Sequence, residues 1–160
     1  MEEKQILSTI NLYDSVEELP EEIQILMKNA VEARANAYAP YSKFKVGAAL
    51  ILENGNIVKG NNQENASYPS GLCAERTAIY AAGANFPEQY IKAMAITAAS
   101  AKHKLTEPIP PCGACRQAIA EYEQKQDKPI EVYFMGSEGK VAHVKALLEL
   151  LPLAFDRKFL

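Results

Sequence analysis

The spacing of hydrophobic residues along the chain predicts helices and strands in alternation. Apolar residues recur three and four positions apart from Ile23 to about Tyr38, which is typical of a helix with one buried face. Ser15 and Glu18 have the spacing of a capping box, and Pro20 stands where the first helical turn would begin. We therefore expect a first helix that starts near residue 20.

A hairpin and three further strands are predicted after this helix. In the stretch KVGAALILENGNIVKG, two hydrophobic runs flank Asn54-Gly55, a pair of residues that favours the tight turn of a β-hairpin. The run IKAMAITAA is continuously apolar and has the length of a strand, so we expect it in the centre of a sheet. The stretches IEVYFM and KVAHV predict two more strands.

Three other helices complete the predicted order. One begins near Cys73 and fades by Gly83, one opens at CGACRQAIAEYE, and the last is expected at KALLELLP. Two strands, then helix, strand, helix and strand, favour an α/β fold in which helices cover both faces of a mixed sheet.

Composition limits the classes of protein that the chain can belong to. With 160 residues we expect a single domain, made of a core from 20 to 160 and an N-terminal extension from 1 to 19. A net charge of −3 argues against a nucleic-acid surface, which usually carries a basic excess. Neither a signal-peptide run nor a membrane-length apolar segment is present, so we expect a cytoplasmic protein without membrane contacts.

Three cysteines at predicted helix beginnings carry the strongest chemical signal. Cys73 opens CAERTAIYAA, and Cys112 and Cys115 lie in PPCGACRQ. Free N–H groups and the positive end of a helix dipole favour thiolates at such positions. An odd number of cysteines without a secretion signal argues against a disulfide framework, whereas three thiolates suit tetrahedral zinc. The pattern predicts one Zn²⁺ per chain.

The fourth position on the metal separates a structural site from a catalytic one. Structural zinc sites have four protein ligands, and only His103 or His143 could complete this one. The chain would then be a zinc module that binds a protein partner. Alternatively the position is open and lies beside Glu75, whose carboxylate could take a proton from water there and return it. Taken alone, Glu75 would be an acidic residue that favours a helix N-terminus.

Four sequence blocks, in this order, resemble the small cytidine deaminases. They are AYAPYSKFKVGAAL, NNQENASYPSGLCAERTAI, PPCGACRQ and ELLPLAF. The order C-x-E and then P-C-x-x-C is also the signature of zinc deaminases in its three-cysteine form. The resemblance implies a three-layer α/β/α fold with a mixed central sheet of about five strands. It also implies hydrolytic deamination of cytidine and 2′-deoxycytidine, with release of ammonia, in pyrimidine salvage.

The resemblance assigns roles around the metal. Cys73, Cys112 and Cys115 would bind zinc, and Glu75 would transfer protons. Arg76 would hydrogen-bond a ligand sulfur and offset the negative charge of three thiolates. For Arg76 the alternative is a simple salt bridge on the helix surface.

The resemblance also assigns a nucleoside pocket. Asn62 and Glu64 would hydrogen-bond the ribose, and a buried carboxylate would repel a 5′-phosphate. Phe44 and Phe155 would flank the base, and the backbone of Ala74 would contact the cytosine edge. Without the resemblance both phenylalanines would be assigned to the core.

Subunit contacts are implied as well. Short members of the family are homotetramers whose active sites take residues from neighbouring subunits. Tyr68 and Phe155 are the candidates for such residues in this chain.

Two other kinds of deaminase share parts of the pattern. Deaminases of cytosine-bearing antibiotics such as blasticidin S have the C-A-E and P-C-G-x-C-R-Q core, but the block NQENASYP and Phe44 favour a nucleoside pocket. Deaminases that act on bases in RNA or DNA typically have His-x-Glu in place of Cys-x-Glu, together with a basic surface. Neither feature is found in this sequence.

Overall fold

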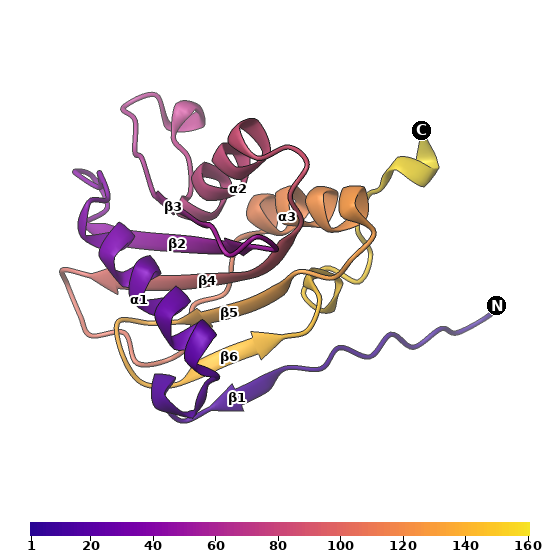
Figure 1. The fold of residues 1–160 in the computed structure, drawn as a ribbon, viewed down its shortest axis with the longest axis horizontal. Helices are drawn as coiled ribbons and strands as arrows, with labels where there is room; N and C mark the ends of the chain where they lie inside the picture. The colour runs from indigo at the N-terminus through magenta and orange to yellow at the C-terminus, as the bar shows by residue number, and fades with distance from the viewer.

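The computed structural model describes residues 1–160 and contains one mixed sheet of six strands in the order β1-β6-β5-β4-β2-β3 (Figure 1). Strands β4 and β5 are parallel, and every other neighbouring pair is antiparallel. The strand bounds are β1 Asn11–Tyr13, β2 Phe44–Leu52, β3 Ile57–Asn61, β4 Ile91–Ser100, β5 Glu131–Met135 and β6 Val141–Val144.

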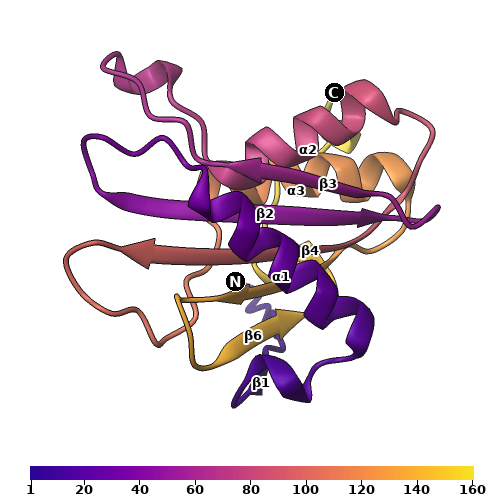
Figure 2. The same ribbon diagram turned by 60° about the vertical axis from the view of Figure 1, so that its left-hand side comes forward.

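Helices cover both faces of this sheet, which confirms the predicted three-layer α/β/α class (Figures 1 and 2). Helix α1 (Glu21–Ala35) lies on one face, and helices α2 (Ala74–Asn85) and α3 (Gly113–Gln126) lie on the other. Side chains alternate along a strand, so β2 supplies both cores: Leu50 packs with α2 and α3, and Ile51 packs with α1. The predicted hairpin is also confirmed, with Gly55 in the left-handed region at φ 85°.

Two close helix–strand contacts fix the layers. A Cβ atom on Gly47 of β2 would lie 2.1 Å from the Ala30 carbonyl oxygen of α1. A Cβ atom on Gly60 of β3 would lie 2.5 Å from the Ala74 carbonyl oxygen, at the start of α2. Because only glycine permits these approaches, Gly60 holds the N-terminus of α2 directly on the sheet.

The predicted number of about five strands was too low. The sixth strand, β1, lies in the N-terminal extension and pairs with β6, with Asn11 opposite His143. It has only three residues and follows no hydrophobic alternation, so its pairing depends on backbone hydrogen bonds that the sequence pattern does not reveal.

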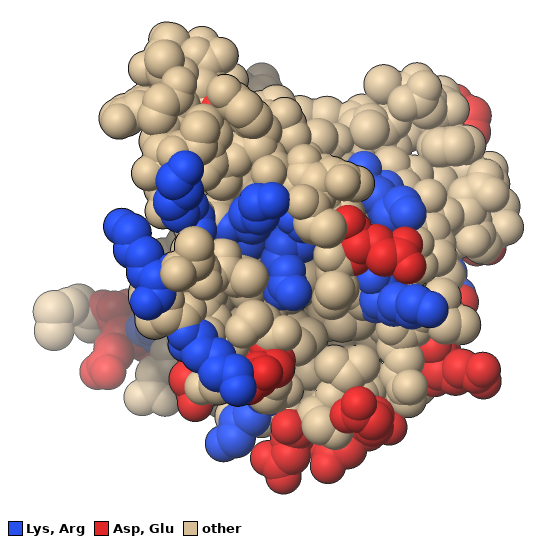
Figure 3. All heavy atoms as spheres, turned by 90° about the vertical axis from the view of Figure 1, so that its left-hand side faces the viewer, with Lys and Arg blue, Asp and Glu red and all other residues tan.

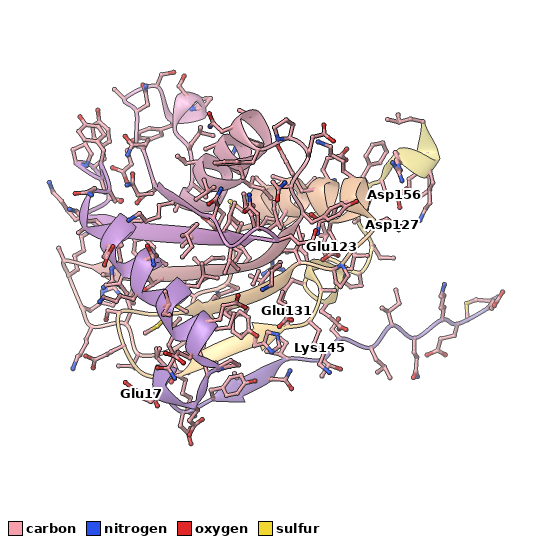
Figure 4. All side chains as sticks on the ribbon, viewed as in Figure 1. Glu17, Glu123, Asp127, Glu131, Lys145 and Asp156 are labelled. Atoms are coloured by element: carbon pink, nitrogen blue, oxygen red, sulfur yellow. The ribbon has the colours of Figure 1, made fainter.

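Two helix predictions were wrong in detail. The stretch KALLELLP forms a single 3₁₀ turn, Leu147–Glu149, instead of a helix. The buried Glu123 carboxylate of α3 accepts the N–H groups of Leu147 and Leu148, which holds this turn against α3 (Figure 4). The expected capping box is also absent, because the Ser15 side chain makes no capping hydrogen bond. A separate 3₁₀ turn, Val16–Glu18, precedes α1.

Charged side chains of both signs share the surface. On the face at the left of Figure 1, lysines and arginines form a broken band with acidic groups beside and below it, and the upper part is largely uncharged (Figure 3). This face therefore offers no continuous basic surface for nucleic acid. None of the helices combines the length and the apolar character that crossing a membrane requires.

Candidate metal centre and active-site pocket

The three cysteines converge where the N-termini of α2 and α3 meet. Cys73 is the N-cap residue of α2, Cys112 is the N-cap residue of α3, and Cys115 lies in the first turn of α3. The three sulfur atoms lie within 4.8 Å of one another, and no histidine or carboxylate joins the group. The prediction from spacing alone, that all three lie at helix beginnings, is confirmed.

The sulfur positions fit a zinc ion. The Sγ atoms of Cys73 and Cys112 are 3.9 Å apart, and those of Cys112 and Cys115 are 3.5 Å apart. Ligands at the usual Zn–S distance of about 2.3 Å in a tetrahedron are separated by about 3.8 Å. The three cysteines therefore supply three of four tetrahedral positions.

Neither histidine can provide a fourth ligand in this arrangement. His103 is exposed in the loop after β4. His143 lies on β6, where its ring nitrogens are bonded to Glu131 and to Asn11. The hypothesis of a structural zinc module closed by a histidine therefore finds no support in the fold.

One positive charge, that of Arg76, lies beside the sulfurs. The Arg76 guanidinium donates from Nη2 to the Cys73 sulfur at 3.7 Å and forms no ion pair with a carboxylate, so the surface salt bridge considered for it is not formed. The pKa of the Cys73 thiol falls to about 5, first through its contact with Cys115 and then through Arg76. The pKa of the Cys115 thiol rises, chiefly through its contact with Cys73.

Arg116 stabilises the segment that carries Cys112. Its Nε donates to the Pro111 carbonyl at 2.9 Å, and its Nη1 donates to the Leu150 carbonyl at 3.0 Å. These bonds tie the segment before Cys112 to the end of the 3₁₀ turn Leu147–Glu149. Sequence reasoning left this arginine without a role, although it stands directly after the last cysteine.

Glu75 lies beside the cysteines and is only 4% exposed. Burial is the main reason why the pKa of its carboxyl is raised, and the neighbouring Cys73 thiolate raises it further. A carboxyl with a raised pKa holds a proton more readily than a solvated one, which suits a group that must both accept and donate protons.

A single pocket of about 810 Å³ opens onto this cluster. Eight of the eleven predicted site residues line this pocket: Phe44, Asn62, Glu64, Tyr68, Cys73, Glu75, Arg76 and Cys112. The other three, Ala74, Cys115 and Phe155, do not. The sequence did not indicate several residues that complete the wall: Tyr41, Ser42, Leu72, Ile109 and Pro110. Of these, Tyr41 and Ser42 fall in the block AYAPYSKFKVGAAL and Leu72 falls in NNQENASYPSGLCAERTAI, but no role was assigned to them.

The Asn62 side chain joins the loop after β3 to the start of β2, and these two segments form one wall of the pocket. Its Oδ1 accepts the Val46 N–H at 2.7 Å, and its Nδ2 donates to the Phe44 carbonyl at 2.9 Å. The amide thus continues the pairing of the loop after β3 with the start of β2. One N–H and one lone pair of Asn62 remain for a ligand.

Glu64 differs from the sequence expectation of a buried carboxylate, because it is partly exposed at the pocket wall. Its Oε2 accepts the N–H groups of Tyr41 and Ser42 at 2.9 and 3.3 Å. Its Oε1 accepts the Ser42 hydroxyl, and these bonds lower the pKa of the carboxyl, the hydroxyl most of all. A loop that supplies its own N–H donors can hold a carboxylate ionised without burying it.

Three other predicted residues lie at the edge of the pocket or outside it. Tyr68 is 78% exposed at the rim and packs edge-on against Tyr41. Phe155 is 59% exposed near the C-terminus, stacks on Phe159 and does not line the pocket of its own chain. Ala74 is fully buried as the first residue of α2 and does not line the pocket.

Three sulfurs with an open fourth position, next to a buried carboxyl in a pocket, define a zinc-dependent hydrolytic site. The sequence model of the protein family named cytidine and deoxycytidylate deaminase zinc-binding region matches residues 20–128 of this chain. The chain belongs to this family, and zinc is its cofactor.

Curated and solved relatives agree with this assignment. The cytidine deaminase of Halalkalibacterium halodurans is 42% identical over 132 residues, which span 82% of this chain and 92% of the relative. The crystal structure of the Burkholderia pseudomallei cytidine deaminase is 41% identical, covers 82% of this chain and 97% of its own, and gives a TM-score of 0.71. The Mycobacterium tuberculosis cytidine deaminase structure is 32% identical, with coverage of 84% and 97% and a TM-score of 0.65.

Proposed function

We propose that the protein is a zinc-dependent cytidine deaminase that converts cytidine and 2′-deoxycytidine to the uridine products and ammonia. One observation carries the proposal: three cysteine sulfurs and the buried Glu75 carboxyl meet at a pocket of about 810 Å³, which is large enough for a nucleoside. The names of the relatives point to cytidine as a substrate.

Cys73, Cys112 and Cys115 are the proposed zinc ligands, because they are the only metal-binding groups that converge in the fold. When bound, zinc supplies a Lewis acid that lowers the pKa of water and so provides a nucleophile near neutral pH. Arg76 offsets the excess negative charge of the thiolates through its bond to the Cys73 sulfur.

Glu75 is the proposed proton carrier. Its carboxylate takes a proton from the attacking water and gives it to N3 of the base, which makes C4 more electrophilic. After the oxygen has added to C4, Glu75 takes the proton of the new hydroxyl group and passes it to the 4-amino group, which leaves as ammonia while the C4 oxygen becomes a carbonyl. The raised pKa of Glu75 fits a group that must alternate between base and acid.

The nucleoside is proposed to lie along the wall formed by β2 and the loop after β3. Phe44 packs against the base, and the backbone of Ala74 contacts its edge. Asn62 and Glu64 bind the ribose, with the carboxylate accepting the 3′-hydroxyl. The ionised Glu64 also repels a 5′-phosphate, even though it is partly exposed.

Substrate comparison tests this proposal. Deamination is followed by the ultraviolet absorbance change on loss of the 4-amino group, with cytidine, free cytosine and cytidine 5′-monophosphate as substrates. Cytidine is expected to be turned over far more efficiently than the other two. Equal turnover of cytidine and its monophosphate would refute the assignment of Glu64.

We further propose a homotetramer as the working unit. Tyr68 and Phe155 are exposed in the single chain. In a tetramer, each could contact the substrate in the pocket of a neighbouring subunit. Sedimentation together with activity provides the check, because a fully active monomer would exclude this arrangement.

The proposed setting is pyrimidine salvage in the cytoplasm. Thiolate ligands need a reducing environment, and all three cysteines are free of disulfides.

We also propose that residues 1–160 act as one domain, since β1 of the extension joins the same sheet as the core.

A further inference from the structure

We infer that Ser42 is a positioning residue for substrate recognition, because its hydroxyl fixes the Glu64 carboxylate and links it to the base wall at Phe44. This inference rests on the proposed role of Glu64 in binding the ribose. It adds a residue from the loop between α1 and β2 to the recognition of the sugar, a role that the zinc and proton chemistry does not require.

The direction of the Ser42 hydroxyl proton is set by its own backbone. The Phe44 N–H donates to the Ser42 Oγ at 2.9 Å, so this lone pair of the hydroxyl is occupied. A serine hydroxyl has a single proton to donate, and here it is donated to Oε1 of Glu64. The hydroxyl therefore connects the start of β2 to the carboxylate in one defined orientation.

The remaining capacity of the Glu64 carboxylate lies on the same oxygen. Each carboxylate oxygen has about two acceptor positions. Oε2 is saturated by the N–H groups of Tyr41 and Ser42, whereas Oε1 receives only the Ser42 hydroxyl. A ribose hydroxyl would therefore bind Oε1 and share it with Ser42, so the serine directly orients the acceptor that the substrate uses.

The turn that contains Ser42 is held in an uncommon conformation. Lys43 has φ 58°, one of two non-glycine residues in the left-handed region. Its N–H donates to the Ala39 carbonyl at 3.2 Å, and its carbonyl accepts the Ala101 N–H at 3.1 Å. A non-glycine residue keeps this conformation only where surrounding contacts stabilise it, as these two backbone bonds do. The turn brings the Phe44 N–H to the Ser42 hydroxyl.

Ser42 is exposed, so its loss should not unfold the protein. Ser42→Ala leaves the two N–H donors of Glu64 in place but removes the bond that orients Oε1. Deleting a hydrogen bond to a charged group usually lowers an affinity by about 10- to 100-fold, and the retained donors place this change near the lower limit. We expect a loss of about tenfold in kcat/KM for 2′-deoxycytidine, mainly through KM.

The experiment compares 2′-deoxycytidine with 2′,3′-dideoxycytidine, which lacks the 3′-hydroxyl. In Ser42→Ala, kcat/KM should fall about tenfold for the first substrate and stay within about twofold for the second. Ser42→Thr, which keeps the hydroxyl, should restore kcat/KM for 2′-deoxycytidine. Ser137→Ala is the matched control, because Ser137 donates to the Leu105 carbonyl and does not line the pocket.

The outcomes separate this inference from the proposed function. If the unmodified enzyme turns over both substrates equally well, the assignment of Glu64 to the ribose fails. If the enzyme prefers 2′-deoxycytidine but Ser42→Ala leaves that preference unchanged, only the inference on Ser42 is overturned. An equal loss on both substrates in Ser42→Ala would also overturn it, since that result indicates a general structural role.

Discussion

The chain contains two clusters of ionisable side chains that include buried members, and they differ in how far their polar groups are already satisfied. On β5 and β6, the His143 ring bonds to Glu131 at 2.8 Å and to Asn11 at 3.3 Å. The Tyr133 hydroxyl donates to Glu131, and the Tyr133 ring stacks on His143 at 4.2 Å. In this cluster, where Figure 4 labels Glu131, every ring nitrogen and hydroxyl has a partner within the chain.

At the helix N-termini the opposite holds. The cysteine sulfurs contact chiefly one another and Arg76, the Glu75 carboxyl contacts the Cys115 sulfur, and the Arg76 Nε is buried without a partner. Buried polar groups that lack partners are costly, so their retention indicates a ligand or a reaction that uses them. The comparison separates a polar cluster that stabilises the fold from one that is available for chemistry.

The largest effect should come from removing a metal ligand. In Cys115→Ala the three-sulfur group loses its buried member, so zinc content should fall far below one per chain and deamination should be abolished. Elemental analysis and the absorbance assay on the same preparation check this. Full zinc occupancy in Cys115→Ala would show that another group completes the site.

A smaller effect is expected at the sugar end of the pocket. Glu64→Ala removes a carboxylate with one free acceptor position, and losing a hydrogen bond to a charged group costs about 1.5–3 kcal/mol. Cytidine kcat/KM should therefore fall by about 10- to 100-fold, with zinc content unchanged. Steady-state kinetics measure the loss, and activity within twofold of the parent would exclude a ribose contact.

The smallest effect on activity should come from the satisfied cluster. Replacing His103 and His143 together by Gln should leave zinc near one per chain and deamination near normal, since neither ring reaches the sulfurs. Loss of the buried His143 bonds should lower the free energy of unfolding by about 1–2 kcal/mol, measured by urea titration. If the double variant contained no zinc, the hypothesis of a structural site with a histidine as fourth ligand would be supported instead.

The sequence predicted what depends on periodicity and on cysteine spacing. Strand β4, the Asn54-Gly55 hairpin and the convergence of three cysteines follow from local patterns, and the fold confirms them. The placement of α2 on the sheet depends on Gly60, whose neighbours are distant in sequence and could not be derived from it.

What the sequence missed depends on contacts between distant segments. Strand β1 forms because its backbone pairs with β6, and the turn at Leu147 forms because Glu123 accepts its N–H groups. The partly exposed position of Glu64 and its link to Ser42 could not be derived either, since a carboxylate held by loop N–H groups has no periodic signature.

Glu75→Gln tests most directly the claim that the unsatisfied cluster is the catalytic one. Glutamine keeps the size of the side chain but cannot accept and return a proton, and general acid–base catalysis typically contributes ~10²–10⁴-fold. Zinc content, cytidine binding and turnover are measured on one preparation. We expect zinc near one per chain, cytidine binding changed much less than turnover, and a rate reduced by at least about a hundredfold. A Glu75→Gln protein that deaminates cytidine within tenfold of the parent would contradict the mechanism.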